Sequence, residues 1–185
     1  MTYLWRTPGN YPNRLMGMYQ RRVSRDSYAF RHGKPAKETG ERVDFVFECR
    51  LADLKGLGCV CNSTLIPLVS PRLADFLMRE VGEDIQLIKA RVIAKDGETD
   101  RYKLLNITRL VSCFDKDKSK MLYLPEGHMY GFEYLVHKPG CMGSSHLARD
   151  AGYLGHIIVS DELAAKMRAL NMPGISLVRP EDVYP

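Results

Sequence analysis

The sequence predicts an α+β fold with a mainly antiparallel sheet and two main helices, and three observations support this prediction. One strand–helix–strand pattern occurs twice, and the two copies align without a gap when Leu68 is set opposite Ile158 and Leu87 opposite Leu177. Apolar runs typical of strands also outnumber helical patterns. Turn-forming segments between these runs favour hairpins over regular crossover connections. The chain is therefore expected to contain two similar strand–helix–strand units.

The first unit is centred on a helix expected between Ser70 and Gly82. The Ser70 hydroxyl can cap the helix, and Pro71 suits the first helical position because its missing N–H would have no partner there. Gly82 can end the helix because it adopts a left-handed conformation at little cost. A short apolar run at residues 65–69 precedes this helix, and a strand is expected to follow it at residues 85–94.

The second unit repeats the arrangement around a helix that begins after Ser160. Asp161 and Glu162 occupy its first turn, where negative charge favours the positive end of the helix dipole. Pro173 is expected to stop the helix, and residues 175–178 are predicted to form a closing strand.

Further strands are expected outside the two units. Within residues 43–49, alternate positions place apolar side chains on one face, at Val43, Phe45, Phe47 and Cys49, and acidic ones on the other, at Asp44 and Glu48, as in a half-buried strand. Residues 102–111 form the predicted antiparallel partner of the strand at 85–94, and residues 121–124 and 130–136 are further strand candidates.

Charge divides the chain into a basic N-terminal extension, residues 1–42, and an α+β domain, residues 43–185. The extension holds nine Lys or Arg residues but only three acids, Asp26, Glu38 and Glu41, whereas the whole chain has a net charge of +5. Apart from a short helix within residues 14–28, loop is expected there. Two interpretations stay open: a solvated, partly mobile segment, or an arm that binds nucleic acid or an acidic partner.

Cysteine usage and hydropathy predict a cytoplasmic protein without a membrane partner. The number of cysteines is odd and their spacing matches no disulfide framework, so free thiols in a reducing compartment are expected. No stretch approaches the roughly 20 apolar residues of a membrane span, and the N-terminus lacks the regions of a signal peptide. The five cysteines are Cys49, Cys59, Cys61, Cys113 and Cys141.

No metal or cofactor is expected. The densest set of possible ligands comprises His128, His137, Cys141 and His146. Zinc requires about four nitrogen or sulfur ligands in tetrahedral geometry. No pair in this set has the close spacing that forms half of a site in advance, so packed or surface histidines are the better interpretation.

The sequence also offers one candidate nucleophile, Cys141, with His146 or His156 as base and Asp150 to orient the base. No nucleophile elbow, phosphate-binding loop or His-Glu-x-x-His motif accompanies these residues. We therefore expect no catalytic residues and no enzyme, and keep a cysteine-dependent hydrolase as an alternative.

Seven short motifs follow one another in a characteristic order, at residues 68–73, 85–88, 102–106, 113–115, 146–149, 157–163 and 174–175. Together they resemble the immunity protein 11 family of bacterial polymorphic toxin systems. The likeness covers about residues 43–180 and leaves the basic extension outside.

This resemblance implies a non-enzymatic antitoxin that binds a cognate protein toxin in the cytoplasm. An antitoxin needs a complementary surface and no poised catalytic groups. We expect the contacts in exposed loops, at Asp115, Asp117, Lys118 and Arg149. For Arg149 a second interpretation stays open, in which it pairs with an internal carboxylate and holds the fold together. The positive net charge favours an acidic or neutral toxin.

The alternative from another class is a nucleic-acid-binding module that uses the basic extension. Phosphate contacts from its Arg and Lys side chains would make binding fall steeply with salt. Tyr3, Trp5, Tyr11 and Tyr19 are the candidate stacking residues. Because no recognised motif of this class is present, nucleic acid is the less favoured partner.

Overall fold

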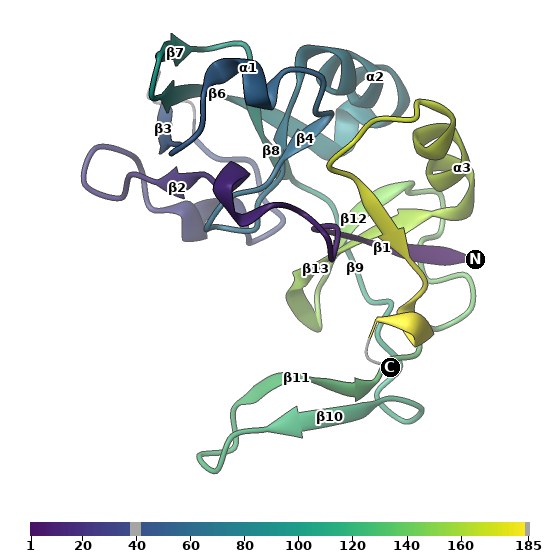
Figure 1. Cartoon of the computed structure of the whole chain (residues 1–185). Coiled ribbons are helices and arrows are strands. Elements are labelled where there is room, and N and C mark those ends of the chain that lie inside the picture. Colours follow the sequence, from purple (N-terminus) through teal and green to yellow (C-terminus); the bar gives the residue numbers. More distant parts are fainter. Residues whose placement is uncertain (38–41, 184–185) are drawn as a thin grey trace.

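The computed structural model describes residues 1–37 and 42–183. Residues 38–41, which include Glu38 and Glu41 of the predicted extension, and residues 184–185 lie outside this description. The described residues form two curled sheets, a separate two-stranded hairpin and three α-helices (Figure 1). The α+β class is therefore confirmed. The sheets are mixed, because β3 pairs with β6 and β9 with β12 in parallel, while the other strand pairs are antiparallel.

The first sheet has five strands in the order β14-β1-β13-β12-β9. Their bounds are β1 Thr2–Arg6, β9 Leu110–Val111, β12 Leu147–Asp150, β13 Tyr153–Ser160 and β14 Ser176–Val178. Strand β1 lies inside this sheet, where Leu4 pairs with Ile158 of β13 and Val178 of β14. The expectation of loop was therefore wrong for residues 2–6, because they pair on both sides with strands from the other end of the chain, and Leu4 and Trp5 are buried on opposite faces of that sheet.

The second sheet follows the order β2-β3-β6-β8-β5-β4, with β7 paired to β6. Its strands are β2 Met18–Tyr19, β3 Val43–Val46, β4 Cys59–Val60, β5 Leu68–Val69, β6 Ile85–Ala94, β7 Gly97–Thr99 and β8 Lys103–Ile107. Strands β10 Lys120–Tyr123 and β11 Met129–Tyr134 form the separate hairpin. The short 3-10 helices are η1 Asn13–Leu15, η2 Ser27–Phe30, η3 Gly82–Asp84 and η4 Pro180–Asp182.

The two main helices begin at the serines that the sequence indicates. The Ser70 hydroxyl accepts a hydrogen bond from the Leu73 N–H at the start of α2 (Pro71–Val81), and the Ser160 hydroxyl accepts one from Leu163 at the start of α3 (Asp161–Ala169). The third helix, α1 (Leu51–Leu54), is a single turn. Both predicted serine caps are thus confirmed. Gly82 follows the end of α2 as expected, but its conformation is right-handed, with φ −55° and ψ −31°, so the expectation of a left-handed residue was wrong.

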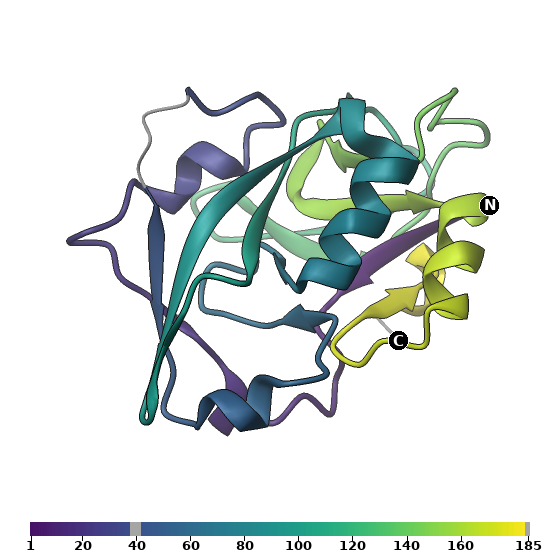
Figure 2. The ribbon, with the colours of Figure 1, turned by 90° about the horizontal axis from the view of Figure 1, so that it is seen from above.

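In each predicted unit the two strands are not direct neighbours in the sheet. Another strand lies between them and pairs with both in antiparallel orientation. The first unit gives the order β5-β8-β6 and the second β13-β1-β14. Helices α2 and α3 lie side by side (Figure 2), and Lys166 of α3 forms an ion pair with Glu80 of α2 at 2.8 Å. The similarity of the two units remains a prediction.

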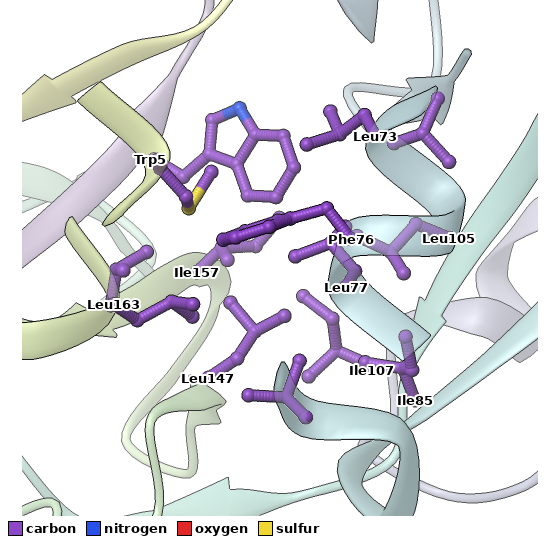
Figure 3. Packing of buried hydrophobic residues seen from close by; sticks show 14 of the residues in the cluster. Trp5, Leu73, Phe76, Leu77, Ile85, Leu105, Ile107, Leu147, Ile157 and Leu163 are labelled. Carbon is purple, nitrogen blue, oxygen red and sulfur yellow. The ribbon is translucent and has the colours of Figure 1, made fainter. Parts of the chain in front are cut away.

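The main hydrophobic core lies between these helices and the sheets (Figure 3). Phe76 and Leu77 of α2 and Leu163 of α3 face Ile157 of β13 and Trp5 of β1. Trp5 is only 6% exposed, so the N-terminal strand supplies the largest side chain of this core. A boundary after residue 42 remains a prediction, but the first strand is integral to the core.

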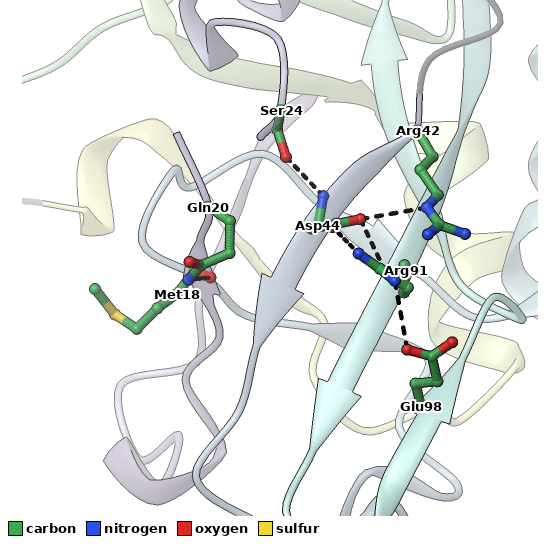
Figure 4. Close-up of polar contacts among 7 residues, drawn as sticks. All are labelled: Met18, Gln20, Ser24, Arg42, Asp44, Arg91 and Glu98. Carbon is green, nitrogen blue, oxygen red and sulfur yellow. Dashed lines mark hydrogen bonds and ion pairs between the residues drawn. The ribbon is translucent and has the colours of Figure 1, made fainter. Parts of the chain in front are cut away.

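Asp44 of β3 connects the residues that follow β2 with β3 and β6 (Figure 4). Its carboxylate is buried and accepts two hydrogen bonds from the Arg91 guanidinium, one of them from Nε at 3.2 Å. Its backbone N–H donates to the Ser24 hydroxyl at 2.8 Å, and its carbonyl accepts from the Gln20 N–H at 2.9 Å. One residue thus connects β6, β3 and the N-terminal segment.

Candidate functional site

The hairpin of β10 and β11 extends away from both sheets (Figure 1) and carries large exposed side chains. Tyr123 is 54% exposed, Tyr130 53%, Tyr134 47% and Leu124 46%. Soluble proteins seldom cluster exposed aromatic and aliphatic side chains on a projecting element, and such clusters mark interaction surfaces. Tyrosine is also enriched among the residues that dominate binding energy at protein interfaces.

One aromatic side chain anchors the hairpin to the body of the protein. Phe132 of β11 is only 1% exposed and contacts the ring of Phe114 edge-on, with 4.9 Å between ring centroids. It also contacts Tyr153 edge-on and stacks on His156, both rings belonging to β13. The Tyr153 hydroxyl donates to the Tyr130 carbonyl at 3.1 Å. The hairpin is therefore held at one side while its other side chains stay accessible.

The predicted contacts Asp115, Asp117 and Lys118 lie in the tight turn that leads into the hairpin. The Asp115 carboxylate accepts hydrogen bonds from the backbone N–H groups of Asp117, at 3.2 Å, and Lys118, at 3.3 Å. Asp115 is buried, whereas Asp117 and Lys118 are exposed. The carboxylate of Asp115 shapes this turn, as aspartate side chains commonly do, and its two neighbours present charge beside the hairpin.

Arg149 does not lie in an exposed loop, which corrects the sequence-based expectation. It belongs to β12 and is only 2% exposed. Its guanidinium donates to the Leu154 carbonyl at 2.9 Å and to the Phe30 carbonyl of η2 at 3.3 Å. Burial lowers the pKa of Arg149 to about 10. Arg149 therefore joins the N-terminal segment to the first sheet from the inside, since its five donors can bridge two separate carbonyls.

Arg149→Met is expected to lower the free energy of unfolding by about 2 kcal/mol, because two buried carbonyl groups lose their charged donor. Urea denaturation measures this loss. Lys118→Met, which changes an exposed basic side chain in the same way, should leave stability unchanged. Equal stability of the Arg149 variant and the wild type would contradict a bridging role.

Two of the five cysteines form a disulfide, so the expectation of free thiols was wrong for this pair. Cys113 follows β9 and Cys141 lies in the loop before β12, and the two are bonded across a sequence separation of 28 residues. Sequence spacing could not indicate this pair, because the fold alone brings the two segments together. Cys49, Cys59 and Cys61 are free and buried, as expected.

The structure assembles only part of the possible ligand set considered from the sequence. His137 and Cys141 come together with Cys113, and one potential ligand atom from each residue lies within 4.8 Å of the others. His146 instead contacts the Ser160 hydroxyl through Nδ1 at 2.9 Å. His128 lies in the exposed turn of the hairpin. Cys113 was missed, because its partners lie more than twenty residues away along the chain.

The candidate thiol nucleophile is not assembled in the described part of the chain. The sulfur of Cys141 is bonded to Cys113. The carboxylate of Asp150 accepts hydrogen bonds from the backbone N–H groups of Phe114, at 2.8 Å, and Gly152, at 2.7 Å. Asp150 therefore stabilises the segment from which the hairpin extends. The sequence suggested instead that it orients a catalytic histidine.

His156 is buried behind the hairpin, and burial lowers its pKa to about 3. His137 is shifted in the same direction, also by burial. A histidine that stays neutral in the folded state contributes stability that is complete above its unfolded pKa of about 6.5 and is lost as pH falls from there toward the folded pKa. At mildly acidic pH the unfolded chain therefore gains protons that the folded protein excludes.

We expect His156 alone to reduce the free energy of unfolding by about 2 kcal/mol between pH 7 and pH 5. Urea denaturation at both pH values measures this difference. His156→Gln should remove most of it, whereas His128→Gln, which changes an exposed histidine, should retain it. An unchanged pH dependence in the His156 variant would contradict this assignment.

The aromatic residues of the basic segment are not available for stacking on bases. Trp5 and Tyr19 are buried in the hydrophobic cores, and the Tyr11 hydroxyl donates to the Leu15 carbonyl at 3.3 Å. The Tyr3 ring is covered by the Arg168 guanidinium at 4.1 Å from its centroid. The sequence-based list of stacking residues was therefore wrong, because these rings complete the cores of a chain in which β1 is an inner strand.

None of the helices in the described part of the chain combines the length and apolar character needed to span a bilayer.

Comparison with known protein families gives one match that covers most of the chain. The model of the Imm11 immunity protein family matches residues 14–182. The match begins well before residue 43, so most of the basic segment belongs to the family pattern, contrary to the expectation that it lies outside. None of the curated proteins compared matches the chain.

Proposed function

The chain belongs to the Imm11 immunity protein family, and from this premise we propose that it neutralises a cognate protein toxin by direct stoichiometric binding. The toxin is one of a polymorphic or secretion-system type, and neutralisation takes place in the cytoplasm of the producing cell. No catalytic step is required, because a protein that covers an active site or a substrate-binding surface stops the toxin by occupancy.

The exposed side chains of the β10–β11 hairpin carry this proposal. Three half-exposed tyrosines, Tyr123, Tyr130 and Tyr134, offer broad rings with polar tips on a single projecting element. Aromatic side chains of this kind bury a large area and lose little conformational entropy on binding. A projecting hairpin can also enter a concave site on a partner, the usual shape of an enzyme active site.

Asp117 and Lys118 extend the proposed surface at the turn that leads into the hairpin. Both are exposed, so they can form charged contacts at the rim of an interface. Asp115 acts through the shape of the turn, and Arg149 acts through the integrity of the fold. We therefore assign direct contact to Asp117 and Lys118 alone among the four residues selected from the sequence.

Co-expression with the product of the adjacent open reading frame tests the proposal, with growth and co-purification as readouts. Growth rescue together with a stable complex of equal stoichiometry is expected. A toxic neighbour that still kills the cell, or rescue with catalytic amounts of this protein, would contradict stoichiometric neutralisation.

The nucleic-acid alternative needs a new test, because removal of residues 1–42 would delete the inner strand β1 and part of the core. Arg21→Glu combined with Arg22→Glu changes exposed charge on the basic segment and leaves the core intact. An antitoxin that uses the hairpin keeps its activity in this variant. Loss of salt-dependent nucleic-acid binding in this variant, with protection lost in parallel, would favour the alternative.

A further inference from the structure

Three soft or borderline ligands converge at the base of the hairpin. The sulfur atoms of Cys113 and Cys141 and a ring nitrogen of His137 all lie within 4.8 Å of one another. Backbone pairing fixes this arrangement, because Phe114 and His137 form an isolated β-bridge and the Lys138 N–H donates to the Cys113 carbonyl at 2.7 Å. The three side chains therefore come from two segments that the fold holds side by side.

The orientation of His137 adds a second, independent observation. Its Nδ1 lies 3.0 Å from the Thr2 hydroxyl, while its buried Nε2 has no hydrogen-bond partner among the described residues. When Nδ1 carries the proton and donates to Thr2, Nε2 holds a free lone pair. A contact that fixes the second ring nitrogen in this way is typical of metal-binding histidines.

We propose that, when the Cys113–Cys141 disulfide is reduced, the two thiolates and His137 Nε2 bind one zinc-class divalent cation. Two sulfur ligands and one imidazole suit Zn²⁺, which binds such donors at about 2.0–2.3 Å. A water molecule takes the fourth position. The site is independent of the toxin-binding role, although it lies at the foot of the same hairpin.

Reduction and metal binding balance as two separate steps. A thiol reductant of the glutathione class supplies two electrons and two protons, breaks the Cys113–Cys141 bond and becomes a disulfide itself. Zn²⁺ then displaces the two thiol protons, which pass to solvent, and accepts an electron pair from each sulfur and from Nε2. The same two sulfur atoms therefore either form the disulfide or bind the metal, but cannot do both at once.

An open cavity gives the cation access to this place. The cavity has a volume of about 720 Å³, and its lining includes His137 and Cys141 together with Thr2 and Glu181. Cys113 lies behind them and is fully buried. His137 Nε2 is also buried, so a cation from the cavity passes Cys141 before it reaches the other two ligand atoms.

The test uses Co²⁺ alone as a spectroscopic probe on the full chain, either reduced under anaerobic conditions or left oxidised. Reduced wild type is expected to bind about one Co²⁺ per chain, with thiolate-to-cobalt charge-transfer absorption that added Zn²⁺ abolishes. The oxidised wild type should lack this absorption, and this comparison needs no substitution that could impair folding. Thr2→Val should weaken Co²⁺ binding roughly 10- to 100-fold because it removes the partner of Nδ1.

Two matched cysteine variants separate this site from the other thiols. Cys141→Ser should abolish the absorption, whereas Cys59→Ser, at a free buried cysteine, should leave it unchanged. The reverse pattern would overturn the proposal, because it would assign the signal to Cys59 and Cys61. Absence of the absorption in the reduced wild type, or equal absorption in the oxidised wild type, would also overturn it.

Discussion

Simultaneous replacement of Tyr123, Tyr130 and Tyr134 by alanine is expected to abolish protection against the cognate toxin while leaving the fold intact. Each ring is about half exposed, so its removal leaves little cavity in the free protein. At an interface, truncation of a buried aromatic anchor commonly costs about 2 kcal/mol or more, equivalent to roughly a 30-fold weaker complex. Losses at three neighbouring positions need not add, but together they should exceed about 100-fold.

The single alanine variants locate the centre of the interface, and the affinity of the purified pair measured by calorimetry provides the readout. Tyr28→Ala is the matched control, because Tyr28 is 58% exposed in η2 and lies outside the hairpin. The control should bind as the wild type does. If the triple variant is folded and keeps wild-type affinity, the toxin contacts another face and the role assigned to the hairpin is wrong.

Substitutions in the charged turn beside the hairpin should have a smaller effect on toxin binding, independent of the tyrosines. Asp117→Lys and Lys118→Glu change exposed rim charges, so they should act mainly on the association rate and on its dependence on salt. Stopped-flow mixing at low and high ionic strength measures both. Asp115→Asn is less informative about contact, because its carboxylate holds the turn through two backbone N–H groups.

The helices were predictable from sequence because their signals are local. Ser70 and Ser160 cap helices that begin one residue later, and each cap depends on side chains within one turn. The alternation at residues 43–49 likewise predicted β3, although the observed strand ends at Val46. Local rules failed at residues 2–6, where the strand forms because β13 and β14, more than 150 residues away, provide its edges.

The candidate site was only partly predictable for the same reason. The two hairpin strands follow from apolar runs, yet nothing in the sequence distinguishes Phe132, which anchors the hairpin, from Tyr130 and Tyr134, which remain exposed. The periodicity of β10 and β11 is also broken by two register shifts, so alternation does not indicate which face is outward. Arg149 was placed on the surface because arginine is rarely buried, a rule that its contacts with two carbonyls override here.

Asp44 is a second buried charged side chain held by polar contacts, and its substitution should cause a large loss of stability. Asp44→Ala is expected to lower the free energy of unfolding by about 2 kcal/mol, because it removes a carboxylate, only 4% exposed, that accepts two hydrogen bonds from the Arg91 guanidinium. The Arg91 side chain is 26% exposed, so water can reach the guanidinium when the carboxylate is absent, and the loss stays below that of a fully buried unpaired charge. Urea denaturation with a common slope for both proteins measures the change.

Glu98→Ala is the matched control, because Glu98 also lies near Arg91, at 3.5 Å, but its side chain is 60% exposed. Exposed pairs contribute little, so this variant should change stability by less than about 1 kcal/mol. The double variant Asp44→Ala/Arg91→Ala should be less destabilised than the sum of its single variants, since each single variant already removes the interaction between Asp44 and Arg91. Equal stability losses in the Asp44 and Glu98 variants would show that the buried carboxylate does not hold these elements together.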